Sequence, residues 1–409
     1  MGKVLGIIAE YNPFHNGHLY HLEQSKKITS SNYTVAVISG NFTQRGSTSL
    51  VDKWSRAEMA LHSGVDLVIE LPVLYATSSA ENFAEGAIKI LNSLEVVDYL
   101  SFGSETSVTD SLIKIANVLN NEPIEYKILL SQELKKGLSF PKARENALFL
   151  YLKNNNFKNI ISSPNNILGI EYIKALKKYK SNILPISIAR FESGYNDITY
   201  SENIASATAI RNIVKNNGFD ILKNLMPIDS YKILMENIKI GHAIPDLSVF
   251  EKQIIYNLRT MSINEIAELP DVAEGLEFAI KKAANSCNSI VEFLNNIKSK
   301  RYTSTRLQRI LLYSLLKFTK KDMELSKKIN PYIRVLGFNS RGKYLLSEIS
   351  KVNPKLEIIT SVKKFMDNSN NKNLKTMLDK DIHATNIYTI GYDYDSSSNL
   401  DYTKKLIIK

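Results

Sequence analysis

Alternation of apolar and polar segments along the first half of the chain predicts an α/β fold. Short runs in which nearly every residue is apolar are typical of strands that are buried on both faces. Between them, apolar residues recur at helical spacing, which indicates amphipathic helices. We expect strands at Val4 to Ala9, Thr34 to Ser39, Asp66 to Leu71, Tyr99 to Phe102 and Ile183 to Ile188. The intervening helices are expected at Asn16 to Lys27, Lys53 to Ser63, Ala80 to Asn92, Val108 to Leu119, Gln132 to Asn154 and Asn166 to Lys178. Strands that alternate with helices form a parallel, doubly wound sheet, so a Rossmann-like domain is predicted for residues 1–218.

The alternation ends near Gly218, and the segments that follow are mainly helical. They cover Asp220 to Asn237, Ser248 to Arg259, Ile263 to Glu268, Val272 to Ala284, Ser289 to Ile297 and Thr305 to Phe318. A mainly α-helical second domain is therefore expected over residues 219–409, as a candidate for binding RNA. Apolar pieces return at Ile333 to Gly337, Glu357 to Thr360 and Ala384 to Ile390, which favours a small α/β tail whose topology the pattern does not define. Asn339 to Gly342 is expected to be a turn, and Asn368 to Asn373 a surface loop.

Length and composition suit a folded chain of two domains, with 409 residues of which 44% are hydrophobic. The first strand follows Met1 directly, without a signal-peptide pattern, and apolar runs stay shorter than a membrane-spanning segment, so a cytoplasmic protein is expected. Cys287 is the only cysteine, which excludes an internal disulfide and a cysteine-based structural zinc site. It is expected to be a buried, small apolar residue.

Two histidines follow the first predicted strand, in the segment Ile7-Ile8-Ala9-Glu10-Tyr11-Asn12-Pro13-Phe14-His15-Asn16-Gly17-His18. Asn12-Pro13 is a turn signal, and Asn16 is the expected N-cap of the next helix. His15 and His18 are three residues apart in the sequence, so they project from one face at the helix start.

The start of a helix is suited to phosphate, because free backbone N–H groups and the helix dipole attract anions there. Gly17 would let a polyphosphate approach the backbone closely. Paired imidazoles suit an α-phosphate that gains negative charge during adenylyl transfer, so the segment predicts an ATP-using enzyme. A metal-binding pair or two ordinary surface histidines are the alternatives. The segment resembles the HIGH signature of the nucleotidyltransferase superfamily, which includes class I aminoacyl-tRNA synthetases and the adenylyltransferases of cofactor synthesis.

A second segment, Ser206-Ala207-Thr208-Ala209-Ile210-Arg211, is similar to the phosphate loop of the same superfamily. Its hydroxyl and N–H groups at a helix start can hold the β- and γ-phosphates, and the planar guanidinium of Arg211 can bind them. An ordinary helix cap is the alternative. Ala205 and Ala207 stand where such loops often carry Gly or Ser.

Residues just beyond the predicted strands are further candidates, because ligands of parallel sheets bind at the carboxyl ends of the strands. Ser39 to Phe42, Gly103 to Glu105, Asn165 and Arg190 would converge on the histidine helix, although turn and helix-start chemistry explains each of them equally well. The segment Ser39 to Asp52 is expected to be an extended loop near the site, either a mobile lid or a contact to RNA. Lys53 and Arg56 are expected either to face phosphate or to be surface cations.

The net charge of +11 makes a polyanion larger than ATP a plausible partner, and a lysine-rich composition bias of the source organism is the alternative. The densest basic segment is Lys298 to Arg309. Arg306 and Arg309 share a helix face there, with Arg301 and Tyr302 just ahead. We expect these three arginines to contact RNA phosphates, with a solvated helix start as the alternative.

Taken together, the motifs resemble the bacterial tRNA(Met) cytidine acetate ligase family through nearly the whole length. Beside Ala9-Glu-Tyr-Asn-Pro-Phe-His-Asn-Gly-His18, the matching motifs are Ser39-Gly-Asn-Phe42, Phe102-Gly-Ser-Glu105, Ser163-Pro-Asn-Asn-Ile-Leu-Gly-Ile170, Lys300-Arg-Tyr-Thr303 and Gly337-Phe-Asn-Ser-Arg-Gly342. The resemblance implies ATP-dependent formation of acetyl-adenylate, followed by acetylation of the N4 amine of the wobble cytidine in elongator tRNA(Met). Mg²⁺ on the phosphates is expected, although the sequence has no obvious carboxylate cluster for it.

The resemblance also implies a set of site residues. The ATP site would comprise Ile7, Ile8, Ala9, Glu10, Tyr11, Asn12, Pro13, Phe14, His15, Asn16, Gly17, His18, Leu19, Tyr20, Gly103, Asn165, Arg190 and Phe191. Ser206 and Thr208 join it through the phosphate-loop likeness, and His15, His18 and Arg211 are the expected catalytic residues. Two other functions stay open: a cofactor adenylyltransferase acting on a phosphate monoester, and a non-catalytic RNA-binding protein.

Overall fold

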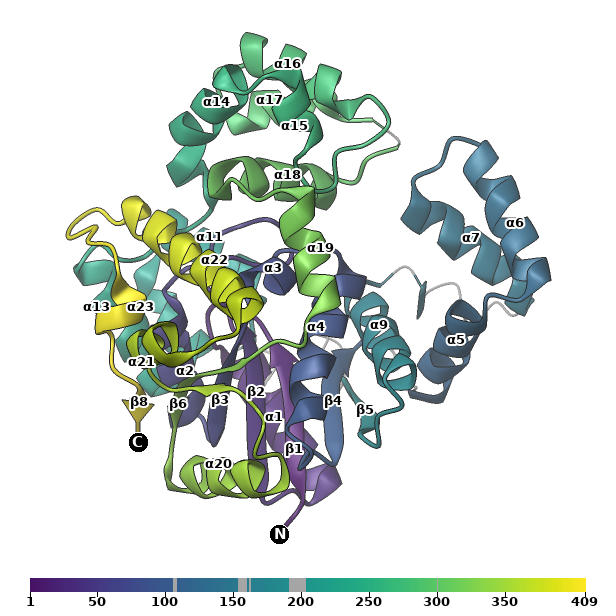
Figure 1. Cartoon of the computed structure of the whole chain (residues 1–409). Coiled ribbons are helices and arrows are strands. Elements are labelled where there is room, and N and C mark those ends of the chain that lie inside the picture. The colour runs from purple at the N-terminus through teal and green to yellow at the C-terminus, as the bar shows by residue number, and fades with distance from the viewer. Residues whose placement is uncertain (106–108, 154–159, 162, 191–203, 300) are drawn as a thin grey trace.

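The computed structural model describes residues 1–105, 109–153, 160–161, 163–190, 204–299 and 301–409 (Figure 1). Phe191 therefore lies outside the described residues.

The five strands of the first half form a parallel sheet in the order β5-β4-β1-β2-β3. They are β1 (Val4–Ala9), β2 (Tyr33–Ser39), β3 (Leu67–Leu71), β4 (Tyr99–Ser104) and β5 (Leu184–Ala189). The predicted α/β class is confirmed, with strand ends that differ by at most two residues. Because the chain runs from β1 to β2 on one side and later to β4 on the other, β1 lies at the point where the strand order reverses. Ligands of open parallel sheets bind at this point.

Alternate residues of the strands pack against two layers of helices. Val4, Ile8 and Val37 face the layer that contains α4 (Ala80–Ser93), α5 (Thr109–Asn121) and α9 (Pro164–Lys178). Leu5 and Ile7 face the layer that contains α1 (Asn16–Thr29), α2 (Lys53–His62) and α11 (Ala207–Lys215). Residues of opposite parity along β1 are therefore buried in different cores, which explains the unbroken apolar run of this strand.

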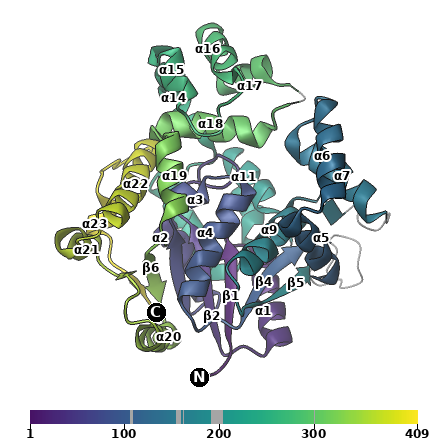
Figure 2. The same ribbon diagram turned by 45° about the vertical axis from the view of Figure 1, so that its right-hand side comes forward.

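Two helices replace the single one expected over Gln132 to Asn154. They are α6 (Ile124–Lys135) and α7 (Phe140–Leu152), which form a hairpin beyond α5 (Figures 1 and 2). The prediction was wrong because Gly137 adopts a φ of +75°, which ends α6, and Pro141 suits the first turn of α7.

Five helices form a lobe at the top of Figure 1. They are α14 (Glu251–Thr260), α15 (Ile263–Ala267), α16 (Leu276–Ser286), α17 (Ile290–Ile297) and α18 (Ser304–Leu316). Every residue from Ile310 to Leu316 is buried, so α18 is covered on all sides. Cys287 is buried here, as predicted. In the chain, α12 (Leu222–Leu225) and α13 (Ile228–Lys239) precede the lobe, and α13 packs against α2, while α19 (Lys320–Lys328) leads out of α18.

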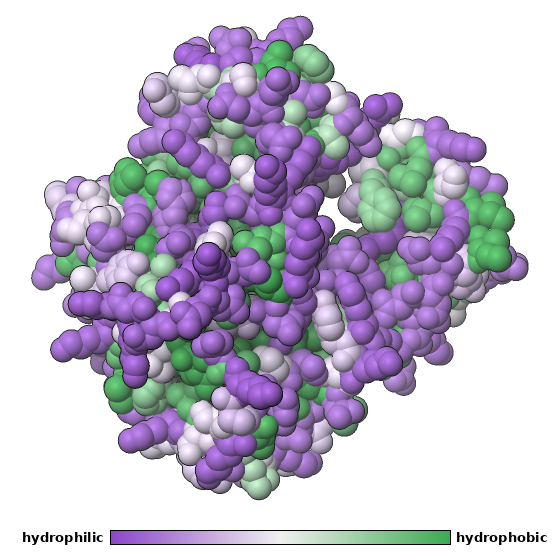
Figure 3. All heavy atoms as spheres, in the orientation of Figure 1, coloured by the Kyte–Doolittle hydropathy of each residue, from purple (hydrophilic) through white to green (hydrophobic). Residues whose placement is uncertain are grey.

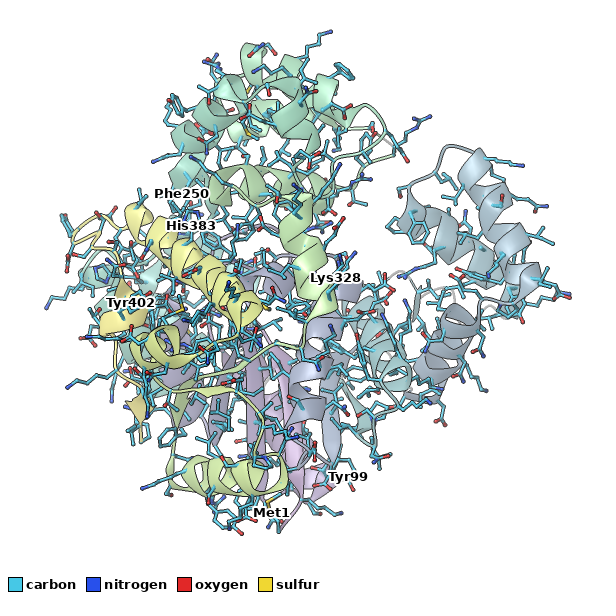
Figure 4. The ribbon with its side chains drawn as sticks, in the orientation of Figure 1. Met1, Tyr99, Phe250, Lys328, His383 and Tyr402 are labelled. Atoms are coloured by element: carbon cyan, nitrogen blue, oxygen red, sulfur yellow. The ribbon has the colours of Figure 1, made fainter. Side chains whose placement is uncertain are left out.

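The tail returns to the sheet of the first half. Strand β6 (Ile333–Phe338) pairs antiparallel with β3, and β7 (Ile358–Ile359) and β8 (Ile407–Ile408) pair with β6. The helices of this part are α20 (Ser340–Val352), α21 (Val362–Asn368), α22 (Lys372–Tyr388) and α23 (Leu400–Thr403). Figure 4 shows Phe250 and His383 where the lobe meets α22. The predicted domain boundary at residue 218 stays a prediction. The sheet contains strands from both sides of this residue.

Two expectations for the tail are wrong. Asn339 to Gly342 is the start of α20, with the Asn339 side chain accepting a hydrogen bond from Gly342 N at 3.0 Å. The piece Ala384 to Ile390 ends α22 instead of forming a separate apolar element. Asparagine serves equally as a turn residue and as a helix cap, which is why the motif was ambiguous.

Lys53 is fully buried, so it is not at the surface, and it does not line the cavity at the end of β1. Its Nζ lies 2.8 Å from Glu70 Oε1 and 2.7 Å from Asp401 Oδ1, and all three side chains are buried. Arg334 from β6 reaches the same Asp401 oxygen at 3.5 Å. These charges form a buried network, Lys53–Glu70–Arg334–Asp401, that connects the tail to the first half of the chain.

Arg56 is also fully buried, so the expectation for it was wrong as well. Its Nη1 donates to the carbonyl oxygens of Glu10 at 2.7 Å and Ser39 at 3.0 Å, and its Nε donates to Val51 O at 3.1 Å. The guanidinium therefore satisfies carbonyls where β1 and β2 end, which fixes the two strand ends beside the site.

Most of the face in Figure 3 is hydrophilic, and hydrophobic side chains gather on the hairpin of α6 and α7 at the right. Ile124 and Phe140 are exposed there. Among the described residues, no helix is both long enough and apolar enough to span a membrane.

Candidate active site

A cavity of about 730 Å³ opens at the carboxyl ends of β1, β4 and β5, beside the first turns of α1 and α11. Its wall combines histidines, arginines and apolar side chains. The described residues that line it are Ile7, Ile8, Ala9, Glu10, Tyr11, His15, Gly17, His18, Tyr20, His21, Gln44, Arg45, Phe83, Phe102, Gly103, Asn165, Leu168, Tyr172, Ile188, Ala189, Arg190, Ile204, Ala205, Ser206, Ala207, Thr208 and Arg211. The two separate motifs of the sequence thus meet in one place.

His15, not Asn16, is the N-cap of α1. Its Nδ1 accepts a hydrogen bond from Gly17 N at 3.0 Å, and His18 Nδ1 accepts one from His15 N at 3.3 Å. This reciprocal arrangement is a capping box built from two histidines. Because His15 Nδ1 is an acceptor, its neutral ring carries its proton on Nε2. His15 is therefore a hydrogen-bond donor through Nε2, and the ring centroids of His15 and His18 are 3.8 Å apart.

Burial keeps both rings neutral at physiological pH. It lowers the pKa of His15 to about 3, with Arg190 and Arg211 acting in the same direction. Burial likewise lowers the pKa of His18 well below its ordinary value, helped by His15 and His21, while a hydrogen bond to the Pro13 carbonyl opposes the shift. A neutral donor pair between two arginines can bind an anion without an imidazolium charge.

His21 is a third histidine of the cavity that the sequence analysis missed. Its Nε2 lies 3.1 Å from Ser101 Oγ, which in turn lies 2.6 Å from Ser25 Oγ. Burial lowers the pKa of His21 to about 4. The spacing from His15 through His18 to His21 was the available signal, since residues three apart share a helix face.

The start of α11 forms the opposite wall. Ser206 is its N-cap and accepts a hydrogen bond from Ala209 N at 3.1 Å. Arg211 donates through Nη1 to Asn12 O at 2.9 Å and through Nη2 to Thr208 Oγ1 at 3.0 Å. These contacts join the phosphate-loop segment to the histidine segment and hold the guanidinium at the cavity.

Gly103, Asn165 and Arg190 also line the cavity. A Cβ on Gly103 would lie 3.3 Å from Arg190 Cγ, so the absence of a side chain makes room for the arginine. Asn165 Nδ2 donates to Glu105 Oε1 at 2.6 Å, and Glu105 Oε2 accepts from Asn166 N at 3.1 Å. Glu105 thus orients the start of α9 toward the cavity.

Several expected ATP-site residues serve the fold around the cavity. Among the described residues, its wall does not include Asn12, Pro13, Phe14, Asn16 or Leu19. Asn12 accepts from Leu50 N through Oδ1 at 2.6 Å and donates to Thr48 O through Nδ2 at 3.3 Å, so it fixes the turn after β1. The apolar wall of Phe102, Leu168 and Tyr172 was missed, because apolar residues at helical spacing are usually core.

The segment Ser39 to Asp52 is packed against the rest of the fold and is not an extended lid. Most of its side chains are buried, and Phe42 and Thr48 form a β-bridge across it. Gln44 N donates to Glu10 Oε1 at 3.0 Å. At Gly46, with a φ of +74°, a Cβ would lie 2.5 Å from Arg309 N, so the segment touches the backbone of α18.

The three arginines expected at an RNA surface have different surroundings. Arg301 is exposed. Arg306 donates to Asp271 O from Nε at 2.9 Å and from Nη2 at 2.7 Å, and lies 5.0 Å from the centre of the Tyr302 ring. Arg309 is 7% exposed and its Nη2 lies 2.7 Å from Asp271 Oδ2. Asp271, distant in sequence, was not foreseen as their partner.

No group of three or more His, Cys, Asp or Glu side chains that could hold a metal ion occurs within the described ranges.

Comparison with known proteins gives one consistent result. The family model described as HIGH Nucleotidyl Transferase matches residues 2–402. A tRNA(Met) cytidine acetate ligase of Thermoanaerobacter sp. (strain X514) is 46% identical over 405 residues, which is 99% of each chain. The tRNA(Met) cytidine acetate ligase of Acetivibrio thermocellus is 43% identical over 415 residues, with 99% of this chain and 100% of that one covered.

A solved structure with the same fold is that of Thermotoga maritima TmcAL bound with alpha-thio ATP. It superposes with a TM-score of 0.92 at 36% identity, and the match covers 99% of both chains. An apo form of the same protein superposes with a TM-score of 0.93.

Proposed function

Because this chain belongs to the tRNA(Met) cytidine acetate ligase family of HIGH nucleotidyltransferases, we propose that it activates acetate with ATP and acetylates N4 of the wobble cytidine of elongator tRNA(Met). It is an ATP-using ligase that acts in tRNA modification. The acetyl-adenylate intermediate, the acetylated atom and the cytoplasmic location belong to the proposal.

The observation that carries the proposal is the meeting of two donor histidines and two arginines at the start of α1. In the first step, an acetate oxygen attacks the α-phosphorus of ATP and pyrophosphate leaves. In this proposal the ring N–H groups of His15 and His18 donate to the α-phosphate oxygens as these gain charge. Fixed, neutral donors of this kind stabilise the transition state without rearranging.

The other groups of the cavity are assigned to the rest of the nucleotide. Arg211, Ser206 and Thr208 hold the β- and γ-phosphates and then the departing pyrophosphate, and Arg190 neutralises charge on the opposite side. The apolar wall of Phe102 and Leu168 suits the adenine base. Mg²⁺ enters with the ATP phosphates in this proposal, because the described residues offer it no cluster of ligands.

In the second step, the cytidine amine attacks the acetyl carbon of the mixed anhydride. The base has to leave the stack of the anticodon loop to reach a recessed site. We assign the approach of the tRNA to the side of α18, where Arg301 is exposed. Arg306 and Arg309 contribute positive charge there, although both are bound to Asp271.

The histidine assignment is tested by acetate-dependent exchange of labelled pyrophosphate into ATP. We expect the double variant His15→Ala, His18→Ala to lose at least about 10²-fold of the wild-type exchange rate, because removal of one such donor typically costs this much. The matched control is His62→Ala, which removes a surface histidine of α2. Full exchange by the double variant would contradict the assignment.

The tRNA product is tested separately by mass spectrometry of tRNA incubated with enzyme, ATP and acetate. We expect acetylated cytidine at the wobble position. A cofactor adenylyltransferase would need a phosphate monoester for exchange, and an RNA-binding protein without catalysis would form neither product. Unmodified tRNA in this assay would contradict the proposed function.

A further inference from the structure

Glu10 is the only acidic side chain among the described residues that line the cavity. It directly follows β1, at the point where the strand order reverses. Its Oε1 accepts a hydrogen bond from Gln44 N at 3.0 Å, and its carbonyl oxygen accepts one from Arg56 Nη1 at 2.7 Å. Within the described part of the chain, Oε2 has no hydrogen-bond donor. One carboxylate oxygen is thus held in place, and the other is available to accept a proton.

The histidines of the cavity are poor proton acceptors. His15 and His18 use Nδ1 to accept backbone hydrogen bonds, and His18 is also hydrogen-bonded to the Pro13 carbonyl. Burial lowers the pKa of His15 to about 3, that of His21 to about 4 and that of His18 as well. Burial raises the pKa of Tyr172, so its hydroxyl stays protonated at neutral pH. Of the described side chains in the wall, this leaves Glu10 as the base.

Glu10 also lies on the side of the cavity that leads to the lobe. The segment that donates to its carboxylate continues from Gln44 to Gly46, which packs directly on the backbone of α18. An RNA that lies on α18 and its preceding residues would therefore reach the cavity past Gln44 and Glu10. The charge of Glu10 opposes the lowering of the Arg211 pKa by burial, and both side chains line the same cavity.

Acyl transfer to an aromatic amine needs a base at this position. As the N4 nitrogen forms its bond to the acetyl carbon, the carbon–oxygen bond to AMP breaks and AMP leaves as an anion. The amine nitrogen then carries a surplus proton, which must be removed for the amide to form. A positioned carboxylate can take it and release it to water afterwards.

We propose that Glu10 is the general base of the transfer step and accepts the proton of the cytidine amine on Oε2. This inference rests on the proposed function. Beside its expected place in the ATP site, Glu10 is thereby assigned a proton transfer in the second step, whereas His15 and His18 act in the first step.

The test compares the two steps in the Glu10→Gln variant, which keeps the shape of the side chain and an oxygen for Gln44 N. We expect single-turnover transfer from preformed acetyl-adenylate to tRNA to slow by about 10² to 10⁴-fold, and acetate-dependent pyrophosphate exchange to fall by a far smaller factor. Hydroxylamine, a nucleophile that needs little help from a base, should trap the acetyl group at the wild-type rate. The matched control is Glu81→Gln on α4, which removes a carboxylate paired with Lys174 at the surface.

The outcomes are distinct. Transfer at the wild-type rate by Glu10→Gln, with wild-type enzyme active, would overturn the inference and leave the proposed function standing. An equal loss of exchange and transfer would also overturn it, since Glu10 would then serve the first step, for example through Mg²⁺. Wild-type enzyme that forms neither acetyl-adenylate nor acetylcytidine would overturn both.

Discussion

At the scale of single residues, the histidines of α1 combine two tasks. His15 caps the helix through Nδ1 and, by the same hydrogen bond, fixes its other nitrogen as a donor toward the cavity. A Ser or Asp cap would satisfy the backbone equally well but would leave no ring N–H pointing outward. This arrangement makes the free energy of unfolding depend on pH, because His15, His18 and His21 are all buried in their neutral form.

We therefore expect stability to fall when the pH is lowered through 6.5. In the unfolded chain these histidines take up protons with a pKa near 6.5, whereas in the folded chain His15 does so only near pH 3. Between these values the unfolded state binds more protons, so the free energy of unfolding decreases as pH falls, by up to about 1.4 kcal/mol per pH unit per histidine. The contribution is fully present above pH 6.5.

The measurement is urea unfolding between pH 7.5 and pH 4.5, for wild type and His15→Gln. On acidification, the free energy of unfolding should decrease less for the variant than for wild type. Above pH 7, its dependence on pH should be the same for both proteins. Carboxylates titrate in both proteins, so only the difference between them reports on His15. Equal slopes throughout would show that His15 is accessible to protons in the folded state.

Which residues carry this chemistry was only partly predictable. His15, His18, Arg190 and Arg211 have distinctive spacing or strand-end positions, and the cavity brings them together. The cap role of His15 was missed because histidine is not a usual cap residue. Lys53 and Arg56 were misjudged for a common reason. Their partners lie far away in sequence, and a local pattern does not show whether a cation will be buried with them.

At the scale of elements, contact between the segment Ser39 to Asp52 and α18 couples the nucleotide site to the lobe. Gly46 is the residue of this segment that packs on the backbone of α18. Its φ is +74°, and almost no space remains there for a side chain. Gly137, between α6 and α7, has a φ of +75° with nothing within 4 Å of a Cβ. The two glycines thus differ in surroundings but not in backbone conformation.

Replacing Gly46 and Gly137 with alanine, one at a time, separates the free-energy cost of backbone strain from that of a steric clash. Gly137→Ala should cost about 1 kcal/mol, the price of a left-handed conformation for a residue with a Cβ. Gly46→Ala should cost about 1 to 3 kcal/mol more, because the methyl group clashes with the backbone of α18. Chemical denaturation of both variants measures the difference. Equal losses would mean that the segment moves away from α18 without penalty.

Strands were the elements that local sequence specified best, and some helix starts were also correct: the whole of β1 and the start of α2 match their predicted bounds. The break between α6 and α7 was missed, because apolar periodicity continues across Gly137 and hides a change of direction. The start of α20 was equally ambiguous. A pattern of polarity defines which face of a segment is buried, but not where the chain reverses.

At the scale of the whole molecule, the decisive feature is the return of the tail to the first sheet. Sequence predicted strand-like pieces in the tail, but not that β6 would lie antiparallel beside β3. Pairing between residues near 70 and residues near 334 depends on contacts across some two hundred and sixty positions, which periodicity does not encode. The helices from α12 to α19, residues 222–328, are consequently an insertion between two parts of one sheet.

Removing Asp401 tests whether the two parts of the chain are one folding unit. Asp401→Ala leaves Arg334 without its carboxylate and Lys53 with Glu70 alone, in a site without water contact. We expect a loss of about 3 to 5 kcal/mol, because breaking a buried ion pair leaves an uncompensated charge. The control Glu348→Ala removes the partner of the exposed Lys351 and should cost at most about 1 kcal/mol.

The same experiment bears on the predicted domain boundary at residue 218. Trp54, the only tryptophan, reports on the first part of the chain, and far-UV circular dichroism reports on all helices. Because Lys53 and Asp401 share one buried network, both signals should change together during unfolding of the wild type. Fluorescence and dichroism would give separate transitions if the parts before and after residue 218 unfolded independently. If Asp401→Ala then shifted only one of these transitions, the buried network would not make the two parts one folding unit.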